Sequence, residues 1–98
     1  MSTYSLGNDP QELARLDHQA EAIARPTAML LQAAGIGPGM RVLDLGTGLG
    51  HVAMQVAAMV GPEGSVVGVD QSAEALEVAR SRARPNVRFE RADVPQRG

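Results

Sequence analysis

The stretch from Val42 to Gly50, Val-Leu-Asp-Leu-Gly-Thr-Gly-Leu-Gly, constrains the fold of this chain more than any other. A short apolar run precedes three alternating glycines, and an apolar, alanine-rich segment with helical spacing follows from His51 to Val60. This order predicts a strand, a tight glycine turn and a helix. Because glycine has no Cβ atom, a ligand can touch the backbone of the turn, and the first amides of the helix point at that ligand. The stretch therefore predicts a turn that binds a nucleotide cofactor.

The residues around the glycines indicate which cofactor. The dinucleotide fingerprint G-x-G-x-x-G requires a third glycine where this chain has His51, and Gly50 falls one residue early. Asp44, two residues before the first glycine, would repel a pyrophosphate and attract a cationic ligand. Asp44–Gly50 resembles motif I, D/E-x-G-x-G-x-G, of the class I S-adenosylmethionine-dependent methyltransferases, whose cofactor carries a net positive charge. The resemblance implies that the turn binds S-adenosylmethionine through Asp44, beside its methionine end, and through Gly46, Thr47, Gly48 and Gly50.

Two further acids follow predicted strands. Ser65–Asp70 is an apolar run that ends in an acid 20 residues after Gly50, and a carboxylate there can accept both hydroxyls of a ribose. Asn86–Asp93 is a third strand followed by an acid. By the resemblance, Asp70 binds the ribose, Asp93 accepts from the adenine amine, and Gln71 lies near the adenine. Acids at the ends of three successive strands form a specific pattern, because open α/β sheets bind ligands along that edge.

These strands and helices predict an α/β fold. We expect a Rossmann-like parallel sheet with flanking helices, incomplete at about three strands, in the order 3-2-1 that right-handed crossovers impose. Residues 1–35 are expected to form an N-terminal helical cap, and residues 36–98 a partial S-adenosylmethionine-binding domain. The first strand, Val42–Leu45, would lie at an edge although it is apolar. An apolar edge invites pairing, so we expect marginal stability, self-association or a missing partner segment.

The segment before the sheet reads as two helices. Asp9 and Pro10 are typical of a helix start, and Pro26 predicts that this helix ends or kinks at Arg25, with a second helix from about Thr27 to Ala34. The resemblance implies that these helices cover the cofactor mouth and part of the acceptor site.

Three single residues leave two interpretations open. Tyr4 belongs either to a disordered tail or to a lid over the cofactor. His18 fits an exposed helix surface, with a general base as the alternative. His51 fits a partly exposed helix start, with contact to the cofactor or the acceptor as the alternative.

Composition excludes several kinds of chemistry. The chain of 98 residues contains no Cys and no Lys, which excludes disulfides, thiolate nucleophiles, Cys-ligated zinc and Schiff bases, and we assign no metal ligand. A net charge of −2 gives no reason to expect nucleic-acid binding. The sequence shows neither a signal peptide nor an apolar run of membrane-spanning length, so we expect no membrane partner and a cytoplasmic location.

The expected function is methyl transfer to an unidentified small-molecule acceptor, with this chain supplying the cofactor-binding half of the enzyme. The resemblance points to the quinone-biosynthesis and natural-product type of small-molecule methyltransferase, in which positioning and desolvation supply much of the rate. No residue is assigned as a catalytic base. Two alternatives remain: a non-catalytic fragment that retains the cofactor-shaped surface, and an NAD-binding oxidoreductase domain.

Overall fold

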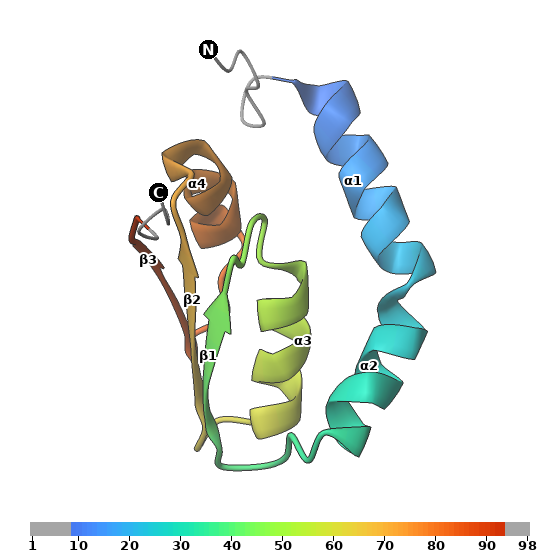
Figure 1. Ribbon diagram of the computed structural model, residues 1–98, viewed down its shortest axis with the longest axis vertical. Coiled ribbons are helices and arrows are strands. Elements are labelled where there is room, and N and C mark those ends of the chain that lie inside the picture. Colours follow the sequence, from blue (N-terminus) through green and yellow to red (C-terminus); the bar gives the residue numbers. More distant parts are fainter. Residues whose placement is uncertain (1–8, 94–98) are drawn as a thin grey trace, which may run out of the picture.

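The computed structural model describes residues 9–93 of the chain. Their strands form one parallel sheet in the order β1-β2-β3, with β1 at Arg41–Leu45, β2 at Ser65–Asp70 and β3 at Val87–Arg91. Helices α3 (His51–Val60) and α4 (Ala73–Ser81) form the two crossovers between these strands (Figure 1). The predicted fold and strand order are thus confirmed.

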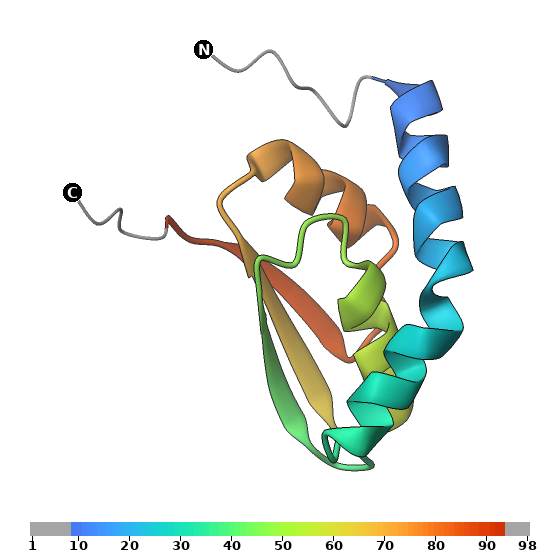
Figure 2. The ribbon, with the colours of Figure 1, turned by 45° about the vertical axis from the view of Figure 1, so that its right-hand side comes forward.

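The helices lie in layers on one side of the sheet. Both α3 and α4 pack directly on it, α2 (Ala24–Ala33) lies outside α3, and α1 (Pro10–Ala22) continues beyond the start of α3 (Figure 2). No residue of α1 or α2 is fully buried, and α2 reaches the core through the partly buried Leu31. Among residues 9–93 no helix combines the length and the apolar character needed to cross a membrane.

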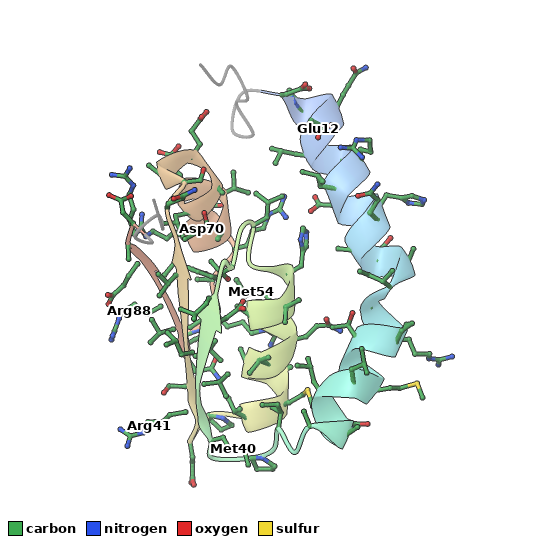
Figure 3. All side chains as sticks on the ribbon, in the orientation of Figure 1. Glu12, Met40, Arg41, Met54, Asp70 and Arg88 are labelled. Carbon is green, nitrogen blue, oxygen red and sulfur yellow. The ribbon has the colours of Figure 1, made fainter. Side chains whose placement is uncertain are left out.

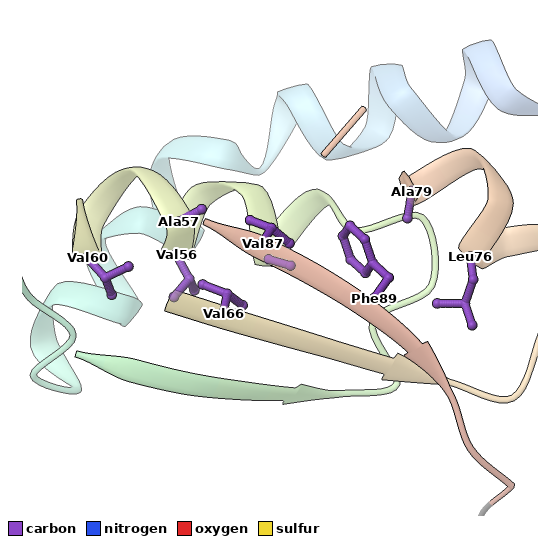
Figure 4. Close-up of a cluster of buried hydrophobic side chains, with 9 residues drawn as sticks. Val56, Ala57, Val60, Val66, Leu76, Ala79, Val87 and Phe89 are labelled. Atoms are coloured by element: carbon purple, nitrogen blue, oxygen red, sulfur yellow. The ribbon is translucent and has the colours of Figure 1, made fainter. Parts of the chain in front are cut away.

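The hydrophobic core lies between the sheet and the inner helices (Figure 4). Its largest fully buried side chains are Leu76 of α4, Val60 of α3 and Val66 of β2. Alternation along β3 directs Val87 and Phe89 toward this core. Burial of each such side chain contributes about 1.5–3 kcal/mol. The packing of this core therefore fixes how the two inner helices sit on the sheet.

Helix α1 begins as predicted, but α2 begins at Ala24 and not at about Thr27, so the two helices divide at a different residue. Asp9 caps α1 by accepting a hydrogen bond from the Glu12 amide at 3.1 Å. The break between α1 and α2 falls at Ile23, so the prediction of a break at Arg25 was wrong by two residues. Pro26 occupies the third position of α2, where the first turn of a helix needs no backbone donor. The proline is thus accommodated inside the second helix.

The opposite face of the sheet is bare. Leu43 and Leu45 of β1 point to this face and are 59% and 72% exposed. The Arg88–Glu90 ion pair, at 2.7 Å, borders the same face at the opposite edge of the sheet, on β3. A hollow of about 750 Å³ on this surface is lined in part by Leu43, Val67 and Arg88. The apolar part of the bare face thus adjoins the free edge at β1, which is the edge strand that the sequence predicted.

The division into a cap of residues 1–35 and a domain of residues 36–98 stays a prediction. Tyr4 lies outside the described residues.

Candidate cofactor-binding site

The three glycines of motif I all adopt left-handed backbone conformations. Their φ angles are +72° at Gly46, +56° at Gly48 and +84° at Gly50, a region that side chains with a Cβ atom rarely enter. The amides of Gly46 and Thr47 donate to the carbonyl of Val69 at 2.8 and 2.9 Å. These two bonds hold the turn across the carboxyl end of β2, where an open α/β sheet binds its ligand.

The glycines have different surroundings. A Cβ atom at Gly50 would lie 2.8 Å from Cζ of Phe89 and 3.2 Å from Cβ of Ala79, so this glycine lets α3 begin close against β3 and α4. A Cβ atom at Gly46 or Gly48 would meet no atom within 4 Å. Gly50 therefore serves packing, whereas Gly46 and Gly48 border open space.

Thr47 connects the turn to the strand before it. Its hydroxyl donates to Oδ2 of Asp44 at 2.9 Å, and the residue is only 8% exposed. This bond fixes the orientation of the Asp44 carboxylate at the end of β1. Asp44 itself is half-buried and retains further acceptor positions on its two oxygens.

Asp70 joins the glycine turn to the start of α4. Its Oδ2 accepts from the Gly48 amide at 2.8 Å, and its Oδ1 accepts from the Ser72 amide at 2.9 Å. Figure 3 shows Asp70 at the upper end of the sheet, close to the turn. Each carboxylate oxygen can accept a second hydrogen bond, so the side chain can still receive donors from a ligand.

The residues predicted near the adenine reach the same sheet edge but lie farther out. Gln71 is exposed, and its carbonyl accepts from Nε of Arg91 at 2.8 Å. The Asp93 carboxylate is 79% exposed and 3.9 Å from the Arg91 guanidinium. The Ala92 amide donates to the Asp70 carbonyl at 3.0 Å, which keeps the segment after β3 beside the end of β2. The structure thus assembles one inner group around the turn and one outer group around Arg91.

A groove of about 400 Å³ runs between α1 and the glycine turn. Thr47, Gly48 and Leu49 line it from the turn, and α1 contributes Leu16, Ala20 and other residues. His51, the first residue of α3, also lines it.

Comparison with known proteins decides the family. A family model described as a methyltransferase domain matches residues 36–96, which contain the sheet, α3, α4 and every predicted site residue. The chain belongs to the class I S-adenosylmethionine-dependent methyltransferases. S-adenosylmethionine is the cofactor of this family, and the match favours it over the dinucleotide alternative.

Several known proteins resemble this methyltransferase chain over two thirds or more of its length. It is 41% identical over 71 residues to a 2-phytyl-1,4-naphtoquinone methyltransferase of Nostoc sp., covering 67% of this chain and 31% of the relative. A solved SAM-dependent methyltransferase from Aquifex aeolicus matches 87% of this chain and 47% of its own with a TM-score of 0.74 and 28% identity. Aeropyrum pernix fibrillarin, solved with natively bound S-adenosyl-L-methionine, matches 70% of this chain and 32% of its own, with a TM-score of 0.60 and 26% identity.

The chain spans between 14% and 31% of the length of eight curated relatives that it resembles. The residues present nevertheless fit the cofactor of the family. Open space lies above Gly46 and Gly48, and Asp44 and Asp70 retain acceptor positions toward a cationic, hydroxyl-bearing ligand.

Two sets of contacting residues in this methyltransferase chain could not be predicted from the sequence. Arg91 connects Gln71 and Asp93, although nothing in its local sequence marks it. Asp17 of α1 contacts both His51 and Arg82, residues 34 and 65 positions away along the chain. Pairing over such distances leaves no signal in the spacing of residues.

Proposed function

We propose that this chain supplies the cofactor-binding half of a methyltransferase that transfers the methyl group of S-adenosylmethionine to a small-molecule acceptor. The observation that carries the proposal is the hydrogen bond of 2.8 Å between the Gly48 amide and Asp70. It brings motif I and the strand-end acid together at the edge where the family binds its cofactor. Neither feature would support the proposal as well if the two lay apart.

Within this proposal each residue has a role that its chemistry supports. Asp44, oriented by Thr47, attracts the cationic methionine end, and Gly46 and Gly48 let the cofactor approach the backbone. Asp70 accepts from the ribose hydroxyls.

The remaining assignments concern the adenine and packing. Gln71 and Asp93 lie on the adenine side, and Gly50 acts indirectly because it seats α3. S-adenosylmethionine supplies an activated methyl group, and the chain contributes binding, orientation and exclusion of water.

The acceptor and the setting belong to the same proposal. A small, neutral, quinone-like acceptor is supported by the likeness to a 2-phytyl-1,4-naphtoquinone methyltransferase. The net charge of −2 gives no support to a nucleic-acid acceptor. A cytoplasmic location and the absence of a membrane partner also stay proposals.

A second candidate is a piece that binds the cofactor but does not turn over alone. The bare sheet face and the free β1 edge favour it, because Leu43 and Leu45 remain largely exposed. The two candidates agree on cofactor binding and differ only in turnover.

Calorimetric titration of the purified chain with S-adenosylmethionine, S-adenosylhomocysteine and NAD tests the shared claim. We expect saturable binding of both adenosyl ligands and none of NAD. Asp70→Ala should weaken the affinity by about 10- to 100-fold, since hydrogen bonds to a charged group contribute about 1.5–3 kcal/mol.

Glu63→Ala is the matched control, because Glu63 is an exposed acid in the turn before β2, at the opposite end of that strand from Asp70. Its binding should equal that of the unmodified chain. Thermal unfolding of each variant verifies that it is folded. Absence of adenosyl-ligand binding by folded chain, or tighter binding of NAD, would overturn the proposal.

A further inference from the structure

Asp17 forms the contact between α1 and the two inner helices. Its Oδ1 lies 2.8 Å from Nε2 of His51 and 2.8 Å from Nη1 of Arg82, and its Oδ2 accepts from Nη2 of Arg82 at 3.0 Å. His51 begins α3 directly after the last glycine of motif I, and Arg82 caps the end of α4. Figure 1 shows α1 passing beside the start of α3.

The charge on Asp17 determines which ring nitrogen of His51 carries the proton. Hydrogen bonds from Arg82 and then from His51 lower the pKa of Asp17 below its usual value of 3.8, against a smaller opposing effect of burial. An ionised carboxylate can only accept, so the shared proton lies on Nε2 of His51. In a neutral ring this leaves Nδ1 as a hydrogen-bond acceptor. An imidazole oriented in this way by a carboxylate is the arrangement that general bases use.

His51 lies where a proton acceptor could act. It lines the groove between α1 and the glycine turn together with Thr47 and Gly48. The groove measures about 400 Å³, within the range of small-molecule sites, about 300–1,000 Å³.

The other lining of the groove is mainly apolar. Ile23 and Val52 line it and remain 59% and 40% exposed, so they have apolar surface to offer a ligand. None of its lining residues is Asp, Glu, Lys or Arg. The chemistry of the groove thus suits a neutral, largely apolar molecule.

We propose that His51, oriented by Asp17, accepts a proton from a neutral, largely apolar methyl acceptor that carries a hydroxyl or N–H group and binds in the α1 groove. The proposal rests on the proposed methyltransferase function. The acceptor heteroatom gives its proton to Nδ1 of His51 and forms the new bond to the methyl carbon of S-adenosylmethionine. The carbon–sulfur bond breaks with its electron pair going to sulfur, and the proton passes from His51 to solvent. Asp17 is the positioning residue for this step.

Charged groups from two elements surround His51. Asp17 and Glu21 of α1 line a separate pocket that His51 also borders, and Arg82 approaches from the end of α4. Asp17 can stabilise the positive charge that His51 gains on protonation, and Arg82 keeps the carboxylate in place during that change.

Nitrogen-15 NMR of the two histidines tests the proposal on the chain itself. Only His18 and His51 contribute, and the exposed His18 serves as the internal reference. With S-adenosylhomocysteine bound, we expect His51 to carry its proton on Nε2, and its Nδ1 resonance to shift saturably with 2-naphthol. The methyl ether of 2-naphthol, which has no proton to donate, should leave Nδ1 unshifted. Asp17→Asn should remove the preference for the Nε2 proton.

A matched pair of variants tests whether 2-naphthol binds in the groove between α1 and the glycine turn. Ile23→Ser should weaken the response of His51 to 2-naphthol at least tenfold, whereas Leu43→Ser should leave it unchanged. Both side chains are 59% exposed, but Ile23 lines the groove and Leu43 lies on the bare face of the sheet.

Four outcomes would overturn the inference: a proton on Nδ1 of His51, no response of His51 to 2-naphthol, an equal response to the methyl ether, or a response that survives Ile23→Ser. Calorimetry with S-adenosylhomocysteine separates this failure from that of the proposed function. Cofactor binding without the His51 response removes only the inference. A response of His51 to 2-naphthol without cofactor binding removes the catalytic role as well as the proposed function.

Discussion

Gly50→Ala tests how the glycine turn is seated on the core. The new Cβ atom would lie 2.8 Å from Cζ of Phe89, closer than real Cβ contacts allow, and 3.2 Å from Cβ of Ala79. Alanine at a φ of +84° costs about 1–2 kcal/mol, and inserting a methyl group into a packed core costs about 1–3 kcal/mol. We therefore expect the free energy of unfolding to fall by about 2–5 kcal/mol, a large part of the stability of a small domain.

Gly48→Ala provides the control for backbone strain. Its φ is +56°, and its Cβ would meet no atom within 4 Å, so only the conformational cost of about 1–2 kcal/mol applies. Urea unfolding followed by circular dichroism gives both values. Equal losses in the two variants would refute the packing argument.

A second background keeps the test informative if Gly50→Ala prevents folding. Phe89→Leu removes the atom nearest to the new methyl group. In that background, Gly50→Ala should cost no more than Gly48→Ala does, apart from the remaining contact with Ala79. A full loss in the Phe89→Leu background would show that Phe89 is not the cause.

Three further predictions concern other parts of the structure. Asp17→Asn should lower the free energy of unfolding by about 1 kcal/mol or less, because the ion pair is 40% exposed on the Asp17 side. Folding lowers the pKa of Asp17 from 3.8, so the contribution of its ion pair to stability is present above pH 3.8 and disappears as the pH falls through the lower pKa of the folded chain. A stability difference between Asp17→Asn and the parent chain that is the same at pH 7 and pH 3 would contradict this expectation. Asn86→Ala should lower the free energy of unfolding in urea by about 1–3 kcal/mol, because Nδ2 of Asn86 donates at 3.0 Å to two carbonyls at the end of α3. A loss below about 0.5 kcal/mol would show that these two hydrogen bonds do not stabilise the end of α3. Leu45→Lys should shift a self-associating chain toward monomer in sedimentation velocity, and a parent chain that is monomeric at every concentration would refute association through the β1 edge.

The features that the sequence predicted correctly are local or follow from general rules of topology. The glycine turn depends on neighbouring residues, and its three glycines all adopt the left-handed conformation. The strand order follows from right-handed crossovers between successive parallel strands. The position of Asp70 beside Gly48 then follows, because both lie at the carboxyl end of the sheet.

The features that the sequence did not predict depend on contacts between distant elements. Pro26 was expected to stop a helix at the residue before it, but a proline in the first turn is compatible with a helix that starts earlier. The bond between Asp17 and His51 requires α1 to lie across the start of α3, and no periodicity encodes that placement. For the same reason, the sequence alone allows two interpretations of His51.

Amide NMR mapping with S-adenosylhomocysteine tests the central claim most directly. We expect saturable shifts of the Gly46, Thr47 and Gly48 amides, with the Gly48 amide most affected because it already bonds to Asp70. The Val67 amide, on the strand beneath the bare face, should not respond. Shifts confined to the bare face, or no shift of the turn in folded chain, would show that motif I does not bind the cofactor.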